Sequence, residues 1–430
     1  MRVLVLGGYG FIGLEIARQL IAAGHDVVCV GRSGRVGRRL LRAATWIEAD
    51  LTRTGTPEFW REHLQSTDVV VNAAGALQSG LEDDVEAIHD TAVADLSSAC
   101  EKAGVRRFIQ ISAVGAAADA NTAFMRSKAR GEDRLRRSTL DWIILRPGLV
   151  IGANARGGTA LLRAIAGTPI VLPVVFGDRL VQTVALSDLV AVLCDAVEGR
   201  IPPRTALDIV EDRPHSLRSV LVTLREWLGM APPRMVIELP EWLVLVAARV
   251  ADGLGHLGWR SPLRTTTMQV LSGNVVGDAG AFRALGGRKL MGLDQTLASL
   301  PATAQERWFA RLYLLLPVAV AVLSAFWLLS GLIALADLEA AAAQSGLATS
   351  AARFVVAGAA VVDLCLGAMI LYRRWAGAAA WCMVVVGIVY LVAGSVTRPD
   401  LWADPLGPLV KILPATMLAL VAASLLGSAR

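Results

Sequence analysis

Short, mostly apolar runs alternate with segments of helical periodicity along the first third of the chain. The runs of four or five residues lie at 2–6, 26–30, 45–48, 68–71, 107–111 and 142–145. Between them, apolar positions recur every three or four residues at 14–23, 57–65, 85–103 and 122–137. Strands that alternate with helices in this way predict an α/β fold with a doubly wound parallel sheet.

A different pattern occupies the C-terminal quarter. Four apolar runs, at 312–336, 354–372, 375–397 and 406–428, are each long enough to cross a bilayer. Only eleven charged residues follow Arg311, although charged residues make up 18% of the whole chain and hydrophobic residues 54%. The runs lack the amphipathic faces of a soluble bundle. We therefore expect an all-α, four-helix transmembrane domain in contact with the lipid bilayer.

The segment between these two parts has a weaker pattern. It predicts a glycine-rich loop at 148–158, a helix at 183–197 capped near Ser187 or Asp188, a strand at 206–210 and a helix at 216–228. The apolar stretch 241–250 is too short to span a bilayer, so it is either a core helix or a helix on the membrane surface. We expect a core at 1–147, a substrate part at 148–300, a linker at 301–311 and a membrane domain at 312–430.

Three glycines follow the first strand. Gly7, Gly10 and Gly13 surround Phe11 and Ile12, and a helical pattern begins at once. This order of strand, glycine turn and helix is typical of a Rossmann-type dinucleotide site. The glycines allow a sharp turn and a close approach of backbone to a pyrophosphate, which would bind the N-terminal N–H groups of the helix.

The residues after the second strand indicate which dinucleotide binds. A site for NAD usually has an acid here, whereas this chain has Arg32, and a guanidinium pairs well with a 2′-phosphate. We therefore expect NADP(H) rather than NAD(H), although a solvated loop of arginines is the alternative. Asp50 and Leu51 follow the third strand, where we expect contacts with the adenine.

Several motifs together resemble the short-chain dehydrogenase/reductase superfamily, on its extended or atypical side that includes NAD-dependent epimerases and dehydratases. The matching residues are the three glycines, Asn72-Ala73-Ala74-Gly75, Ser112, Lys128, Arg146-Pro147-Gly148 and the pair Val184 and Asp188. The nearest subgroup resembles the NAD(P)-binding accessory subunit of respiratory complex I. The resemblance implies that Ser112 orients a substrate carbonyl and that Lys128 holds the nicotinamide ribose, with Asn72 to Gly75 and Pro147 lining the cofactor.

One position departs from the superfamily. The resemblance implies a tyrosine four residues before the lysine, as the proton donor, but the chain has Phe124 there. The spacing places Phe124 and Lys128 on one helix face, so the geometry is kept and the acid is missing. Thr122 and Ser127 are nearby hydroxyls, but an aliphatic hydroxyl is a poor general acid.

Composition excludes some partners. Arginines cluster at 32–42 and 126–137 without interleaved aromatic residues, so no nucleic-acid partner is expected at a net charge of +5. The cysteines, at 29, 100, 194, 365 and 382, show neither metal-ligand nor disulfide spacing. We expect no metal site and a reducing compartment. The opening apolar run is too short for a signal peptide.

The C-terminal runs resemble the DoxX-like family of four-helix membrane domains, including the stretch 399–414 with Trp402 and Asp404-Pro405-Leu406-Gly407. Basic residues favour one side of the runs: Arg307, Arg311, Arg373, Arg374 and Arg430, against Arg353, Arg398 and Lys411. The positive-inside rule then predicts a multi-pass protein of the cell (inner) membrane, with both termini and the first domain in the cytoplasm.

Within the second run, Asp363 needs a partner at that depth of a bilayer. We expect an ion pair with Lys411; a protonated Asp363 bonded to a neighbouring helix is the alternative. Two functions fit the whole pattern. One is an NADP(H)-dependent oxidoreductase or epimerase acting on a lipid-soluble substrate. The other is a non-catalytic NADPH-binding module of a membrane complex, which the missing tyrosine favours.

Overall fold

The computed structural model describes residues 1–53, 57–77, 79, 84–259, 261, 263–347 and 349–427. Two compact units divide the chain by their internal contacts: Met1–Asp252 with Ser261–Ala310, and Gly253–Arg260 with Arg311–Arg430. The predicted fourth apolar run ends at Ser428, and the topology prediction uses Arg430; both residues lie outside the described ones.

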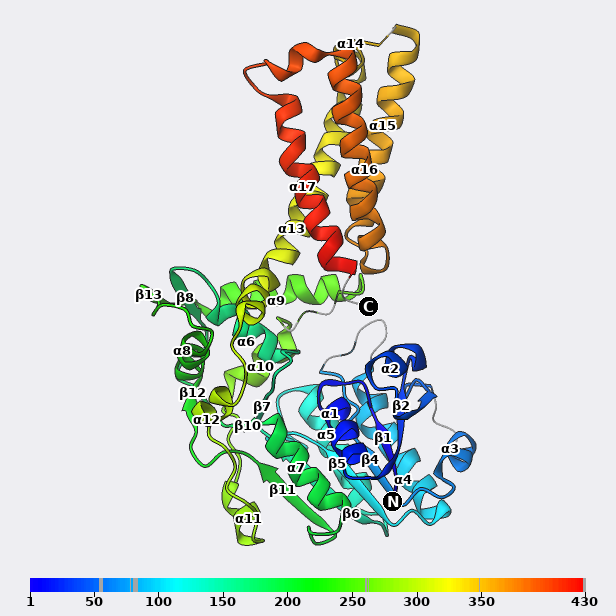
Figure 1. Cartoon of the computed structure of the whole chain (residues 1–430), viewed down its shortest axis with the longest axis vertical. Coiled ribbons are helices and arrows are strands. Elements are labelled where there is room, and N and C mark those ends of the chain that lie inside the picture. The colour runs from blue at the N-terminus through cyan, green and yellow to red at the C-terminus, as the bar shows by residue number, and fades with distance from the viewer. Residues whose placement is uncertain are drawn as a thin grey trace. The chain divides into compact units, whose positions relative to one another are not determined.

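A sheet of seven strands forms the centre of the first unit, in the order β11-β6-β5-β4-β1-β2-β3 (Figure 1). All neighbouring strands are parallel. The strands are β1 (Arg2–Leu6), β2 (Asp26–Gly31), β3 (Thr45–Glu48), β4 (Val69–Asn72), β5 (Arg107–Ile111), β6 (Asp141–Pro147) and β11 (Thr205–Ile209). The predicted doubly wound α/β fold is confirmed.

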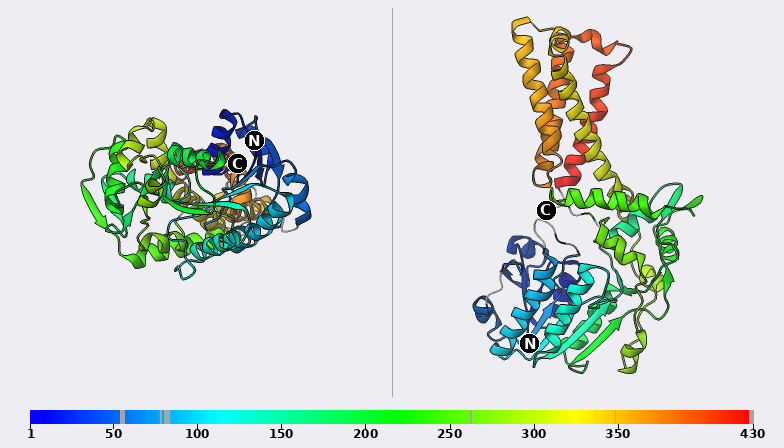
Figure 2. Two further views of the ribbon diagram at one scale, coloured as in Figure 1. Left: turned by 90° about the horizontal axis from the view of Figure 1, so that it is seen from below. Right: turned by 180° about the vertical axis from the view of Figure 1, so that it is seen from behind.

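Helices cover both faces of this sheet (Figures 1 and 2). In β1, Val3 and Val5 pack with residues of α1 and α7, whereas Leu4 and Leu6 pack with residues of α3, α4 and α5. This alternation follows from the two-residue period of a strand, which sends successive side chains to opposite faces. The helices are α1 (Phe11–Ala22), α2 (Gly34–Leu40), α3 (Pro57–Leu64), α4 (Ala92–Ala103), α5 (Ala123–Arg136) and α7 (Leu186–Val197).

The order of the strands reverses beside β1, which pairs with β2 on one side and β4 on the other. In open parallel sheets a ligand binds at the carboxyl ends of the strands at such a reversal. The glycine turn after β1 and the residues 72–75 after β4 meet at this place.

The rest of the first unit is a smaller lobe with its own apolar core, built from residues of α6, β8, α8 and α12. Its elements are β7 (Leu149–Ile151), α6 (Gly158–Ala166), β8 (Val171–Val174), β9 (Leu180–Val181), β10 (Thr183–Ala185), β12 (His215–Ser216), α8 (Leu217–Trp227), β13 (Met235–Glu238), α9 (Glu241–Gly255), α10 (Thr265–Ser272), α11 (Ala279–Ala284) and α12 (Leu293–Ala298).

Two local expectations for this lobe are corrected. The predicted loop at 148–158 contains β7, which pairs with β10 because residues 183–185 continue as a strand before the helix. Helix α7 therefore begins at Leu186, and its N-cap is Ala185 rather than Ser187 or Asp188. The Asp188 carboxylate instead accepts a hydrogen bond from Met291 N at 2.7 Å, a contact between residues far apart in sequence.

The second unit is helical. Its elements are α13 (Ala304–Ala336), α14 (Leu338–Gln344), α15 (Thr349–Met369), α16 (Arg373–Thr397), η2 (Pro399–Trp402) and α17 (Pro408–Gly427). The four long helices are apolar enough to cross a membrane and run side by side (Figures 1 and 2). Helix α13 already begins at Ala304, so most of the expected linker at 301–311 is helical.

A polar cluster lies inside the helical unit. Asp363 of α15 is only 4% exposed and accepts hydrogen bonds from Ser330 Oγ of α13 at 2.8 Å and from Tyr390 Oη of α16 at 2.7 Å. The expected ion pair with Lys411 is wrong for the described residues, because Lys411 is exposed and two hydroxyls already bond the carboxyl. Hydrogen bonds to neighbouring helices are the other way to satisfy an intramembrane carboxyl group.

Candidate functional site

The glycine turn has the backbone that a dinucleotide requires. Gly7 has a φ of +71°, and a Cβ at Gly13 would lie 2.3 Å from Gly7 O. Helix α1 begins at Phe11 with Gly10 as a cap that offers no side chain, and its described first turn has no acid. The N–H groups of Phe11, Ile12 and Gly13 therefore point from a helix N-terminus with no carboxylate to occupy them, which suits a pyrophosphate.

Arg32 follows β2 at the adenosine end of this site. Its backbone N–H donates to Tyr9 Oη at 3.1 Å, and Tyr9 stacks on Trp46 at 6.0 Å between ring centroids. The structure also brings an acid here that the sequence pattern did not reveal. Glu48 Oε2 accepts from Gly34 N at 2.8 Å, and so binds the N-terminus of α2.

Asp50 lies after β3, as predicted, and Leu51 packs against the core beside it. Asp50 Oδ1 accepts hydrogen bonds from Thr52 N at 3.1 Å and Thr52 Oγ1 at 2.8 Å. Burial opposes its ionisation, but these bonds and the charges of Arg32 and Arg53 lower the pKa of Asp50 below its ordinary value. Asp50 is thus an anion near Arg32.

Residues 72–75 run beside the glycine turn. Asn72 is buried; its Nδ2 donates to Gln110 Oε1 at 3.0 Å, and its Oδ1 accepts from Ala74 N at 3.1 Å. Ala73 N donates to Leu6 O at 3.1 Å, which joins this segment to the end of β1. Gly75 leaves open the space next to Lys128 Nζ, which lies 3.5 Å from the position of a Cβ there.

Ser112 and Lys128 come together at the end of β5. Lys128 Nζ donates to Ile111 O at 3.0 Å, and Ser112 follows directly in the chain. Ser112 Oγ is buried and has no hydrogen-bond partner among the residues that the structure describes. Burial, opposed by the nearby Glu132, lowers the pKa of Lys128 from 10.5 to about 8. A buried hydroxyl without a partner calls for an explanation, and an absent ligand is one.

Phe124 occupies the expected place on α5. The centroid of its ring lies 6.0 Å from Lys128 Nζ. The two nearby hydroxyls are engaged elsewhere: Thr122 Oγ1 accepts from Met125 N at 3.2 Å and caps α5, and Ser127 Oγ donates to Phe124 O at 2.9 Å. Neither is positioned by these contacts as a substitute for the missing phenol.

The sequence pattern missed His89, which is buried beside Phe124 with 5.4 Å between ring centroids. Its Nε2 accepts from Ala76 N at 3.2 Å, so Nδ1 must carry the hydrogen and donate to Ser127 Oγ at 3.0 Å. Burial and the charge of Lys128 hold the pKa of His89 well below its ordinary value. His89 is therefore a neutral imidazole that fixes residues 75–76. It lies in the π-helical turn η1 (Ala87–Thr91), which helical periodicity does not distinguish from an α-helix.

The sequence pattern also missed Arg156. This exposed side chain lies in the loop after β7, and its Nη1 donates to Tyr9 O at 3.3 Å. The bond places a guanidinium on the backbone of the glycine turn, 147 positions away in the chain. The carbonyl oxygen of Pro147, at the end of β6, accepts a hydrogen bond from Val114 N at 3.2 Å.

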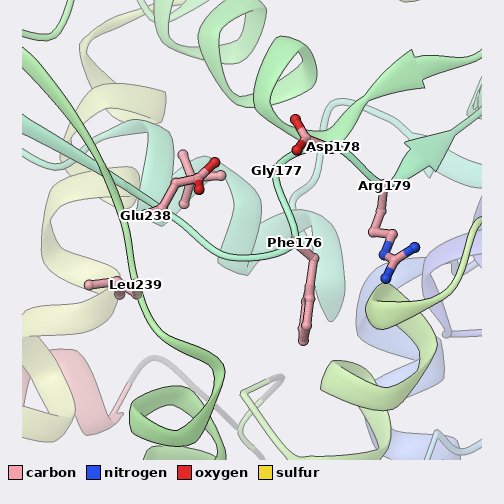
Figure 3. Close-up of a pocket in the computed structure, with 7 residues that line it drawn as sticks. Phe176, Gly177, Asp178, Arg179, Glu238 and Leu239 are labelled. Atoms are coloured by element: carbon pink, nitrogen blue, oxygen red, sulfur yellow. The ribbon is translucent and has the colours of Figure 1, made fainter.

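The smaller lobe contains a pocket of about 390 Å³, which includes none of the residues named above (Figure 3). Phe176 and Arg179 extend to one side of the loop between β8 and β9. Phe176 has a φ of +55°, an unfavourable conformation for a residue other than glycine. The lining residues are Val174, Phe176, Gly177, Asp178, Arg179, Glu238 and Leu239.

Comparisons with known proteins match both parts of the chain. Residues 7–167 match the NAD(P)H-binding family model, and residues 324–420 match the DoxX-like family model. The photosystem II assembly factor Ycf39 of Synechocystis is 33% identical over 146 residues, which are 34% of this chain and 44% of that protein. Subunit 9 of the mouse mitochondrial NADH dehydrogenase (ubiquinone) 1 alpha subcomplex is 28% identical, over 35% of this chain and 41% of the subunit. The chain thus spans less than half the length of these two relatives.

Two further proteins are similar to this chain over a larger share of their own length. Ceramide reductase of Caulobacter vibrioides is 24% identical, over 59% of this chain and 78% of the enzyme. The crystal structure of Bordetella bronchiseptica WbmG in complex with NAD and UDP superposes with a TM-score of 0.52 at 18% identity, covering 69% of this chain and 93% of that one. At this identity the structural likeness concerns the fold alone. The chain thus combines a Rossmann-type domain, similar to the NAD(P)H-binding family, with a region similar to the DoxX-like family and four helices apolar enough to cross a membrane.

Proposed function

We propose that the protein is an NADP(H)-dependent oxidoreductase that reduces a carbonyl group of a membrane-associated substrate. The observation that carries this proposal is the pair at the end of β5. Ser112 Oγ is buried without a described partner, one residue after the carbonyl that binds the buried Lys128 ammonium. Leaving a buried hydroxyl unpaired costs about 1–3 kcal/mol, which a substrate oxygen would offset.

The nicotinamide ring, when bound, supplies a hydride. The Ser112 hydroxyl donates a hydrogen bond to the carbonyl oxygen, and the Lys128 ammonium donates the proton that this oxygen needs. A pKa of about 8 suits this role, because a general acid works best when its pKa lies near the operating pH. The carbonyl gains one hydride and one proton and becomes an alcohol, while the dinucleotide is oxidised. Because Phe124 has no proton to donate, the Lys128 ammonium is the proton donor in this proposal.

A lipid-soluble substrate is proposed because the cofactor domain is joined to membrane helices in one chain. The relative named as a ceramide reductase supports a substrate of this class. The pocket lined by Phe176 and Arg179 supports a binding place for part of a substrate in the smaller lobe.

A second candidate is a non-catalytic NADPH-binding module of a membrane complex. Phe124 favours it, because the site lacks the acid of catalytic superfamily members. Relatives named as an assembly factor and as a subunit of a respiratory enzyme also support it. In this case Lys128 and Ser112 serve only to bind the cofactor.

The test is NADPH oxidation by the purified full chain in proteoliposomes, with and without a lipid extract from the membranes of the organism that makes the protein. The oxidoreductase proposal predicts oxidation that requires the extract and falls at least tenfold in Ser112→Ala. A protein that binds NADPH but consumes none with any extract fraction would instead support the binding module.

Arg32→Asp is expected to weaken NADPH binding about ten- to a hundredfold and NADH binding far less. Loss of a charge-assisted bond to a 2′-phosphate costs about 1.5–3 kcal/mol. Calorimetric titration with both nucleotides measures the difference. Arg39→Asp, at an exposed arginine of α2, the helix that follows Arg32, is the control. Equal losses for both nucleotides would remove Arg32 from the phosphate site.

Arg156→Ala is expected to weaken NADH and NADPH equally, by about tenfold, because its guanidinium lies on the turn where both nucleotides place a pyrophosphate. Binding of 2′-AMP, which has no pyrophosphate, should not change. Arg18→Ala, at an exposed arginine of α1, is the matched control. A loss confined to NADPH would place Arg156 at the 2′-phosphate instead.

We propose that both termini face the cytoplasm in the cell (inner) membrane. The proposal rests on Arg307, Arg311, Arg373 and Arg374, because the positive-inside rule assigns loops rich in arginine to the cytoplasm. Reporter domains fused after Gln344 and after Asp400 should both report the outer side. A cytoplasmic signal at either fusion would contradict the proposed topology.

A further inference from the structure

Helix α9 has an exposed apolar stripe. Trp242 is 65% exposed, Val246 49% and Val250 59%. Their spacing of four residues places them along one face of the helix, and Leu243, 42% exposed, widens it. Val244, Ala248 and Ala251 are buried on the opposite face. The core-helix interpretation of 241–250 therefore holds for one face of α9 only, and the other face needs a different environment.

The strand before α9 also exposes apolar side chains. In β13, Met235, Val236 and Ile237 are all exposed, at 57%, 36% and 38%. Exposed apolar patches on a folded unit mark contacts with protein or membrane.

The last residues of α9, from Gly253 on, belong to the helical unit. After the helix, Leu257 O accepts from Arg373 N at 3.0 Å, and Trp259 Nε1 donates to Leu371 O at 2.6 Å. The Arg373 guanidinium lies 5.5 Å from the centroid of the Trp259 ring. Residues 253–260, Leu371 and Arg373 all belong to the second unit.

These contacts place Leu257 and Trp259 at one end of the long helices. Leu371 and Arg373 lie at the turn between α15 and α16, where one membrane-spanning candidate ends and the next begins. Tryptophan and arginine at the ends of spans lie at the headgroup level of a bilayer. The residues just after α9 are thus held at a membrane–water boundary.

We infer that α9 lies in the surface of the same bilayer, with Trp242, Leu243, Val246 and Val250 among the lipid headgroups and upper acyl chains. The apolar stripe matches an interfacial helix in spacing, and Arg249 at its edge can extend its charge to the headgroups. A bilayer is the environment that we expect at this face. Helix α9 continues into Leu257 and Trp259, which bond to residues at the ends of α15 and α16.

The inference is tested by the accessibility of spin labels in the full chain reconstituted in phosphatidylcholine–phosphatidylglycerol nanodiscs. Single cysteines replace Val246 and Val250, in a background with Cys194, Cys365 and Cys382 changed to alanine; Cys29 and Cys100 are buried. Glu226→Cys on α8, an exposed site, serves as the water-facing control. Val385→Cys, 59% exposed on α16, is the lipid-facing control.

Labels at 246 and 250 are expected to relax with oxygen and to be protected from a water-soluble nickel chelate, as at 385 and opposite to 226. Nickel accessibility equal to that at 226 would overturn the inference. Protection from both reagents would also overturn it, because a protein, such as a second copy of the chain, would then cover the stripe. Neither result bears on NADPH oxidation, so the inference stands or falls apart from the proposed function.

Discussion

Phe124→Tyr is expected to raise the reduction of simple carbonyl compounds above the native rate, by up to about 10²–10⁴-fold, because the phenol adds a positioned general acid beside the Lys128 ammonium and such an acid contributes at most that much. The change adds one oxygen to a half-buried ring, and Lys128 Nζ lies 6.0 Å from the centroid of that ring. The ammonium should lower the pKa of the new phenol. NADPH affinity should change only a few-fold. Absorbance of NADPH, followed with a panel of soluble aldehydes and ketones, measures the rate.

The matched control is Phe59→Tyr, which adds the same oxygen to a partly buried ring of α3, far in sequence from Lys128. It should leave the rate unchanged. Robust native turnover that Phe124→Tyr does not alter would show that position 124 does not face the reacting oxygen. The Lys128 ammonium would then stay the proton donor in both proteins.

Lys128→Met is expected to reduce native NADPH oxidation by about 10²–10⁴-fold while making the protein more stable at pH 7. The lysine is 6% exposed, and burial has lowered its pKa from 10.5 to about 8. This shift means that the buried charge costs the native fold about 3 kcal/mol at neutral pH. The variant removes that cost but also loses the hydrogen bond to Ile111 O, which contributes about 1 kcal/mol. A net gain of about 2 kcal/mol should raise the unfolding temperature.

The pH dependence has a definite sign. Between pH 8 and 10.5 the unfolded chain holds the lysine proton and the folded chain does not, so native stability rises with pH through this range. The advantage of Lys128→Met is therefore complete below pH 8 and vanishes towards pH 10.5. Native turnover should fall above pH 8, because the ammonium that donates the proton is lost.

Thermal unfolding at pH 7 and pH 10 measures the stability change, and initial rates from pH 6 to 10 measure the activity. Lys289→Met, at an exposed lysine, should affect neither. A destabilised Lys128→Met protein would mean that the ammonium contributes more to the native state than its burial costs. Unchanged turnover would exclude Lys128 as the proton donor.

Local sequence determined the main secondary-structure elements of this protein. The run 2–6, the glycines and the helical pattern after them specify a strand, a turn and a helix through contacts among neighbouring residues, and the structure confirms β1 and α1 at this place. The four apolar runs are equally local, because an uninterrupted apolar helix needs no partner to be recognised as a candidate span. The departure at Phe124 was likewise visible in the sequence, because the superfamily that it resembles has a tyrosine four residues before the lysine.

Only the tertiary structure decided which distant side chains meet. His89 and Ser127 are 38 positions apart, and Arg156 reaches the backbone of Tyr9 across 147. The carboxyl of Asp363 accepts hydrogen bonds from Ser330 and Tyr390 and does not pair with Lys411. Helix packing decides which polar groups of different helices lie next to one another. Residues 242–248 are all apolar, so their pattern could not show which face α9 buries and which it exposes. Periodicity reports the faces of an element, whereas its neighbours depend on how the whole chain folds.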